Sequence, residues 1–99
     1  MVAADITPKL KQDFGPNLSR ARELLADFYA ESKGNVSDRL VRAIIYLAHG
    51  DLEELSRVIG VARIDYRDVL WQAEYEGGEV RLRDFNKSFR DLGLVGSGQ

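Results

Sequence analysis

The residues that most often carry catalysis or bind metals are few in this chain, and they are not spaced for either task. There is one histidine, His49, and there is no cysteine, whereas a zinc site needs about three or four suitable ligands. The acidic pairs Glu53/Glu54 and Asp65/Asp68 lie where first helical turns are expected, and the helix dipole favours carboxylates there without any catalytic role. Neither a phosphate-binding glycine loop nor a nucleophile elbow occurs. The sequence therefore predicts a protein that is not an enzyme and that binds no metal or cofactor.

Aromatic side chains gather in the C-terminal part of the chain and are the residues best suited to contact a partner. Tyr66, Trp71 and Tyr75 lie close together in the sequence, and Phe85 and Phe89 alternate with basic residues in an arm at 80–90. Because tryptophan and tyrosine are frequent hot spots of protein interfaces, these five residues form the candidate interface. The alternative interpretation, which is the more common fate of such residues, is that they fill the protein's own core while the arginines of the arm extend outward.

A second function is suggested by residues 52–75, whose pattern is compatible with a helix-turn-helix motif. Gly60 would form the turn, and a basic arm at 79–90 would contact phosphates beside the recognition helix. The candidate nucleic-acid contacts are Arg63, Arg67, Arg81 and Arg83. Against this interpretation, Asp65 and Asp68 would face the phosphate backbone, and the turn would interrupt an otherwise continuous hydrophobic pattern. DNA binding is therefore the alternative hypothesis.

The composition favours a globular chain without a basic character. Of the 99 residues, 44% are hydrophobic and 30% are charged, and the formal net charge is −2. This length corresponds to a single domain spanning 1–99. Nucleic-acid binding is disfavoured because phosphate neutralisation usually requires a basic excess. The longest apolar run, at 43–48, is too short to span a membrane, and no signal peptide is recognisable, so we expect a cytoplasmic protein.

Hydrophobic periodicity predicts an all-α fold, a single-domain bundle of four to five helices. Helices are expected near residues 17–32, 38–49, 52–64 and 66–76, with a further helix at 84–92 and a short one from Thr7 to Phe14 as additional candidates. The helix at 38–49 has the widest apolar stripe, with Ser37 as its N-cap, so we expect it to be the most buried. Residues 80–83 alternate apolar and basic side chains, which suits a short extended C-terminal arm. The ends of the chain, 1–6 and 94–99, are expected to be disordered.

The segment 52–76 carries the clearest pattern. Apolar or aromatic residues recur there at alternating steps of three and four, namely Leu52, Leu55, Ile59, Ala62, Tyr66, Val69 and Ala73. Asp51 and Asp65 both resemble N-caps, and Gly60 weakens a helix interior. The segment therefore forms either one helix or two helices with a bend near 60–65. Its apolar seam suits either the chain's own core or a second copy of the chain.

Residues 50–55, Gly-Asp-Leu-Glu-Glu-Leu, and 65–75, Asp-Tyr-Arg-Asp-Val-Leu-Trp-Gln-Ala-Glu-Tyr, resemble a known pattern. They are similar to small uncharacterised bacterial helical proteins that carry a D-[WY]-R-D-[VL]-L segment near the end of a short chain. The resemblance implies a bacterial, cytoplasmic, helical domain. Because no activity is assigned to that group, it transfers no functional residue to this chain.

Two functions follow from these observations. The first is a non-enzymatic protein–protein interaction module that associates with itself, as a homodimer for example, or with another protein. The alternative is a helix-turn-helix DNA-binding protein or accessory that uses residues 52–75 with the basic arm. The sequence leaves open whether the 80–90 arm packs on its own core or on a partner.

Overall fold

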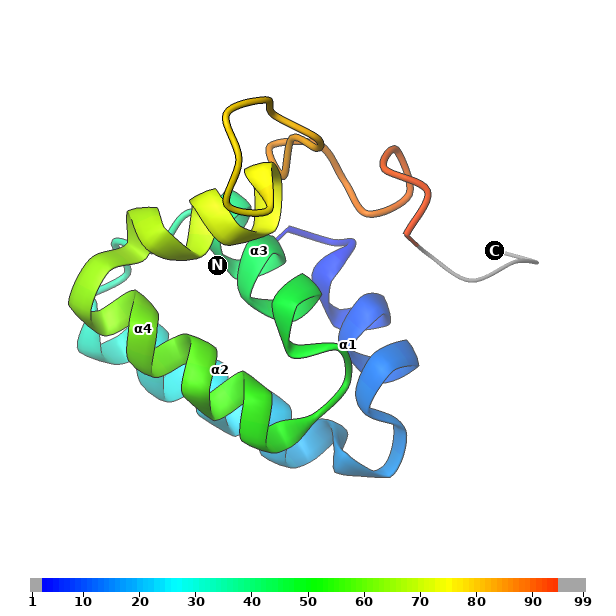
Figure 1. The fold of residues 1–99 in the computed structure, drawn as a ribbon. Coiled ribbons are helices and arrows are strands. Elements are labelled where there is room, and N and C mark those ends of the chain that lie inside the picture. The colour runs from blue at the N-terminus through cyan, green and yellow to red at the C-terminus, as the bar shows by residue number, and fades with distance from the viewer. Residues whose placement is uncertain (1–2, 95–99) are drawn as a thin grey trace.

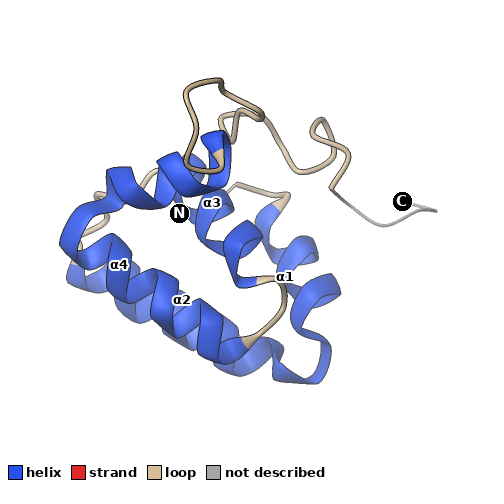
Figure 2. Cartoon of the chain, in the orientation of Figure 1, coloured by secondary structure: helices blue, strands red, loops and turns tan. Residues whose placement is uncertain are grey.

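The computed structural model describes residues 3–94, and within this range all regular structure is helical. The elements are α1 (Ile6–Phe14), η1 (Gly15–Asn17), α2 (Leu18–Glu31), α3 (Asp38–Ala48), α4 (Leu52–Leu70) and η2 (Trp71–Tyr75). Irregular chain follows η2 to the end of the described residues (Figure 2). The predicted all-α class is confirmed. Across residues 3–94, no helix has the length and apolar character that a membrane span requires.

The arrangement differs from the predicted bundle of four to five helices. The first part of α4 packs beside α2, and α4 then bends so that its second part and η2 pack against α3 (Figure 1). Residues 84–92 form turns instead of the expected helix. Residues 80–83 likewise form no strand. The C-terminal segment is thus an irregular cover on a helical body and not an additional helix of a bundle.

Helix α3 is the centre of the core, as the width of its apolar stripe predicts. Its buried apolar side chains are Leu40, Val41, Ala43, Ile44, Ile45 and Ala48. The Ser37 hydroxyl accepts a hydrogen bond from the Leu40 backbone N–H at 3.1 Å, which confirms the predicted N-cap. The helix ends at His49 and Gly50, which both have positive φ. A Cβ on Gly50 would lie 2.4 Å from the Asp13 carbonyl oxygen, so only glycine allows this turn to approach the end of α1.

Helix α4 consists of two helical pieces that meet at Asp65, whose backbone is extended (φ −153°, ψ 98°). The Asp51 carboxylate accepts hydrogen bonds from the backbone N–H groups of the first turn, and Asp65 does the same for the second piece through the Arg67 N–H at 3.0 Å. Both predicted caps are therefore confirmed. Gly60 lies inside the first piece, where the dihedral angles are helical. The helix-turn-helix interpretation placed its turn at Gly60, and this placement is wrong.

The apolar seam of α4 faces the protein's own core, except at the bend. Leu55, Ile59, Ala62, Val69 and Ala73 are buried, whereas Tyr66 is 54% exposed. The bend takes Tyr66 out of register with the rest of the seam because a residue with extended dihedral angles precedes it.

The predicted disorder at 1–6 is wrong for its last residues. Helix α1 begins at Ile6, which is buried, and the Asp5 carboxylate binds Arg42. Residues 1–2 and 95–99 lie outside the described residues, so the predicted disorder there is not addressed. At the other end, Leu94 packs against the core.

Candidate functional site

The most conspicuous surface feature is a set of five large apolar side chains that remain exposed. Their exposed fractions range from 45% to 89%, and they are Ile64, Tyr66, Trp71, Val80 and Leu82. All of them lie between residues 64 and 82, and no other large apolar side chain in residues 3–94 is exposed. We call these five residues the exposed apolar set. Two of its five members, Tyr66 and Trp71, belong to the interface predicted from the sequence.

The bend in α4 explains why Ile64 and Tyr66 are exposed. They flank Asp65, where the change of helix direction turns both side chains away from the core that buries Ala62 and Val69. The Asp65 carboxylate binds within its own helix. It accepts a hydrogen bond from the Arg67 backbone N–H and forms an ion pair with the Arg67 side chain. The bend therefore presents apolar surface without a free charge at its centre.

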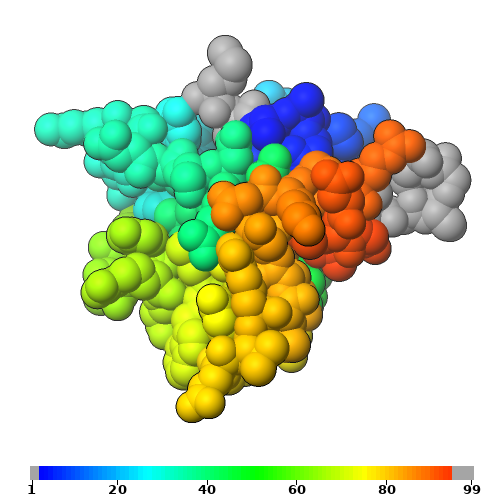
Figure 3. Space-filling model, turned by 90° about the horizontal axis from the view of Figure 1, so that it is seen from above, coloured from blue at the N-terminus to red at the C-terminus, as the bar shows by residue number. Residues whose placement is uncertain are grey.

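Trp71 positions the chain that returns from η2. Its indole N–H donates to the Gly78 carbonyl oxygen at 2.9 Å. Between Trp71 and Gly78 the chain reverses its direction at Glu76 and Gly77, which both have positive φ. Viewed from above, the segment around residue 80 stands on the surface beside the end of α4 (Figure 3). Trp71 thereby lies beside Gly78, two residues before the exposed Val80 in the chain.

A buried carboxylate holds this segment to the helical body. Glu74 has no exposed surface and is bound by Arg39 of α3 and Arg81 of the segment. It also accepts the Phe85 backbone N–H at 2.8 Å. Burial alone would raise the pKa of Glu74, but the hydrogen bonds from Arg39, Phe85 and Arg81 outweigh this effect and hold the pKa below its usual 4.5. Glu74 is therefore charged and serves as an anchor.

A second carboxylate anchors the segment from the opposite end of the chain. Asp5 forms a two-contact ion pair with Arg42 of α3, with N–O distances of 2.8 and 3.0 Å. It also accepts the Phe89 backbone N–H at 3.0 Å. Arg42 in turn donates to the Phe85 carbonyl oxygen at 2.9 Å. The Arg42 hydrogen bond holds the pKa of Asp5 below its usual 3.8. Together with Glu74, this pair fixes the backbone around both phenylalanines.

The phenylalanine side chains consequently belong to the core. Phe85 and Phe89 have no exposed surface, and their ring centroids lie 6.2 Å apart in an edge-to-face contact. Their prediction as interface residues is wrong, and the arm at 80–90 packs on the protein's own core. Tyr75, also predicted at the interface, is only half-buried and is not part of the exposed apolar set.

The four predicted nucleic-acid contacts are all engaged with carboxylates of the same chain. Arg63 pairs with Glu31 and Arg67 with Asp65. Arg81 pairs with Glu74 and Asp84, and Arg83 pairs with Glu76 and lies over the Tyr46 ring. The structure therefore does not combine these arginines into one basic surface, because each lies beside an acid that neutralises its charge.

Sequence reasoning missed the anchoring residues Asp5, Arg39, Arg42 and Glu74. One signal was present, since Arg42 stands inside the apolar run of α3, where a cation needs a buried partner. The identity of the partner was not readable, because Asp5 lies 37 residues away in the sequence.

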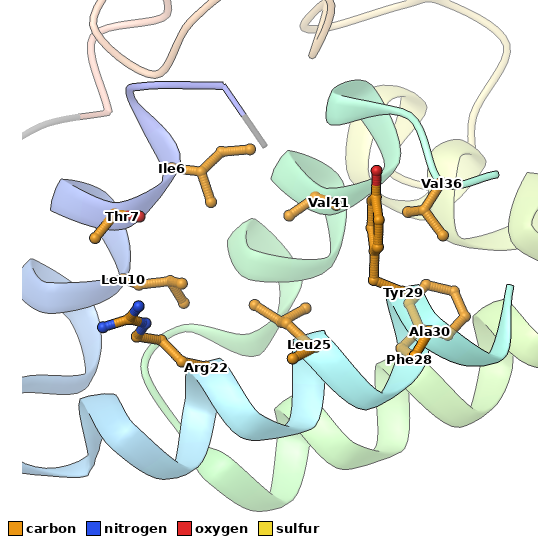
Figure 4. Close-up of a pocket in the computed structure, with 11 residues that line it drawn as sticks. Ile6, Thr7, Leu10, Arg22, Leu25, Phe28, Tyr29, Ala30, Val36 and Val41 are labelled. Atoms are coloured by element: carbon orange, nitrogen blue, oxygen red, sulfur yellow. The ribbon is translucent and has the colours of Figure 1, made fainter. Parts of the chain in front are cut away.

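A separate cavity of about 300 Å³ opens between α1, α2 and α3 (Figure 4). Its walls are mainly aliphatic and aromatic side chains, namely Ile6, Leu10, Leu25, Phe28, Tyr29, Val36 and Val41. Thr7 and Arg22 lie together at one end of it. None of the lining residues belongs to the exposed apolar set, so the cavity and that set are distinct surfaces.

The described residues contain no cluster of three histidine, cysteine or acidic side chains that would hold a metal ion. His49 lies at the end of α3 with its ring centroid 5.6 Å from that of Tyr46.

Comparisons of the chain with protein families, with curated protein sequences and with solved structures find no match.

Proposed function

We propose that this protein is a non-enzymatic interaction module that associates with a second copy of itself through the exposed apolar set. The observation that carries the proposal is the confinement of all five exposed large apolar side chains to residues 64–82. Scattered apolar residues are normal on a protein surface, so five large exposed apolar side chains within one segment of the chain mark that segment as the candidate interface. Tyrosine and tryptophan are also the residue types that contribute most to interface affinity.

The energetics favour a modest, concentration-dependent dimer. Full burial of one large apolar side chain stabilises by about 1.5–3 kcal/mol, and a two-fold interface uses each side chain of the set twice. The members are already part-buried in the monomer, so the gain per side chain is smaller than this. Association costs roughly 4–15 kcal/mol in lost freedom of motion. Because the gain and the cost are of similar size, the expected dimer is weak and not obligate.

Sedimentation velocity over a wide range of protein concentration tests the proposal. The wild-type chain is expected to pass from monomer to dimer as concentration rises. A double variant, Ile64→Ser with Leu82→Ser, should shift this transition to higher concentration by about tenfold or more, because each change removes an exposed apolar contact. Neither side chain makes a polar contact, so the fold should survive, which circular dichroism would verify.

Lys87→Ser serves as the matched control, because Lys87 is exposed, makes no ion pair with a described residue and lies outside the exposed apolar set. It should leave the transition in place. A wild-type chain that stays monomeric at every concentration would overturn self-association, as would an equal shift in the control.

The DNA-binding alternative has no comparable support. Its turn does not occur at Gly60, and its arginines are paired with carboxylates of the same chain. Self-association is therefore the better supported of the two functions.

A further inference from the structure

We propose that the cavity between α1, α2 and α3 binds a small amphipathic carboxylate, with its alkyl chain inside and its carboxylate at Arg22. This site goes beyond self-association and shares no residue with the exposed apolar set.

The walls of the cavity specify the alkyl part of the ligand. Most of the side chains that line it are apolar, and Leu25 and Val41 lie around its middle (Figure 4). A volume of about 300 Å³ is at the lower end of the range for small-molecule sites, which is roughly 300–1,000 Å³. Walls of this kind stabilise methylene groups and leave polar groups without partners. The ligand must therefore place its polar group at an end of the cavity.

Arg22 specifies the charge of that polar group. Eight of the ten arginines pair with a carboxylate of the chain, namely Arg20, Arg39, Arg42, Arg57, Arg63, Arg67, Arg81 and Arg83. Arg22 makes no such pair with a described residue, and it is the only arginine that lines this cavity. Its helix neighbours at three and four residues are Ser19, Leu18, Leu25 and Ala26, so no acid on its own helix face neutralises it.

The position of Arg22 matches a carboxylate that leaves the apolar space. In Figure 4 its guanidinium lies at the same end of the cavity as Thr7, beside Leu10. A guanidinium binds a carboxylate through two parallel hydrogen bonds, and a single arginine balances a single negative charge. The positive charge thus lies at one end of the cavity, and the apolar walls extend from it.

Isothermal titration calorimetry with decanoate, below the concentration at which it forms micelles, tests the proposal on the full chain. Decanol and decylamine are the matched probes, since they keep the chain length and replace the carboxylate by a neutral or a positive group. Decanoate should bind with one site per chain, and decanol and decylamine should bind at least tenfold more weakly.

Arg22→Gln should weaken decanoate binding by about tenfold or more and leave the weaker binding of decanol unchanged. Arg90→Gln is the control, because Arg90 is another exposed arginine without an ion pair to a described residue and lies outside the cavity. Backbone amide shifts in nuclear magnetic resonance spectra should concentrate at Thr7, Leu10, Leu25 and Val41.

Three results would each overturn the site. Decanoate that does not bind would do so, as would equal affinity for decanol and decanoate, which indicates apolar partitioning without recognition of charge. Shifts that concentrate at the exposed apolar set would assign the ligand to the other surface. The proposed self-association is tested independently, since Arg22→Gln leaves every member of the exposed apolar set in place and should not change the monomer–dimer transition.

Discussion

The part of the chain before the bend at Asp65 and the part after it are held together by different forces. Residues 6–64 are joined mainly by apolar side chains from three helices around α3, and no large apolar residue among them except Ile64 is exposed. The later part is irregular after η2, and the charged groups Glu74, Arg39, Asp5 and Arg42 fix its backbone. It also carries four of the five residues of the exposed apolar set.

This difference follows from what each segment can satisfy locally. A helix pairs its own backbone groups, so apolar packing is enough to hold it. An irregular segment that packs on the core has backbone N–H groups that need partners from elsewhere. Here the Phe85 N–H binds the buried Glu74 carboxylate, and the Phe89 N–H binds the part-buried Asp5 carboxylate. Because the C-terminal segment is held at discrete points, its intervening residues are free to present apolar side chains to a partner.

The largest effect on stability is expected from removing a buried aromatic ring of the C-terminal segment. Phe85→Ala should lower the free energy of unfolding by about 3–5 kcal/mol, because a fully buried ring is deleted and a cavity remains. Urea denaturation measures this loss. Val80→Ala is the control, since Val80 is exposed and its change should be small. A loss of less than about 1 kcal/mol for Phe85→Ala would contradict the packing of Phe85 in the core.

Removal of the buried charge of Glu74 should give the next largest effect on stability. Glu74→Gln removes the negative charge between Arg39 and Arg81 and should destabilise by about 2–4 kcal/mol, since both arginines are partly exposed and recover some hydration. The Phe85 amide should also lose protection against hydrogen exchange. Glu76→Gln, at the exposed partner of Arg83, is the matched control and should cost at most about 1 kcal/mol. Equal losses in the two variants would show that burial of Glu74 adds nothing.

Acidification should loosen the C-terminal segment before the helical body. The pKa values of Asp5 and Glu74 are lower in the folded chain than their usual 3.8 and 4.5, so the unfolded chain binds more protons at acidic pH. The stability they contribute is therefore present above about pH 5 and is lost as pH falls through their folded pKa values. Hydrogen exchange at decreasing pH should show earlier loss of protection at Phe85 and Phe89 than at Ile45 of α3. Simultaneous loss at all three amides would contradict separate anchoring.

The smallest effect is expected at the exposed ion pairs. Arg63→Ala with Arg67→Ala should change the free energy of unfolding by no more than about 1 kcal/mol per pair, because the pairs of Arg63 with Glu31 and Arg67 with Asp65 are solvated. Fluorescence anisotropy of labelled duplex DNA at roughly 50 and 200 mM salt should show no salt-sensitive binding by the wild-type chain. Binding at the lower salt that disappears in the variant would favour the DNA-binding alternative over the interaction module.

Local signals in the sequence were sufficient for most helix boundaries. Ser37, Asp51 and Asp65 each cap a helix with a side chain that reaches a backbone N–H two or three residues later. Such contacts depend only on neighbouring residues, as does the periodicity that placed α2 and α3. The bend in α4 could be predicted for the same reason, because the cap that begins its second piece is formed by Asp65 and a residue two positions later.

Helical spacing was misleading at 84–92, where Phe85, Phe89 and Leu92 do point towards the core but no helix forms. The Phe85 and Phe89 N–H groups bind carboxylates that lie 11 and 84 residues away in the sequence, so they are withdrawn from helical pairing. The exposure of Tyr66 was missed for a related reason. A heptad pattern gives the face of a residue only while the helix stays straight.

The sequence by itself thus determined the all-α class, the caps and the burial of α3, because these depend on spacing and on contacts within a few residues. The tertiary structure decided the course of the C-terminal segment, the pairing of Arg39, Arg42 and Arg63 with acids 32 to 37 residues away, and the existence of a cavity with an unpaired arginine. These features arise where distant segments meet. Which acid reaches each of these three arginines is set by the packing of whole helices, and no spacing along the chain encodes it.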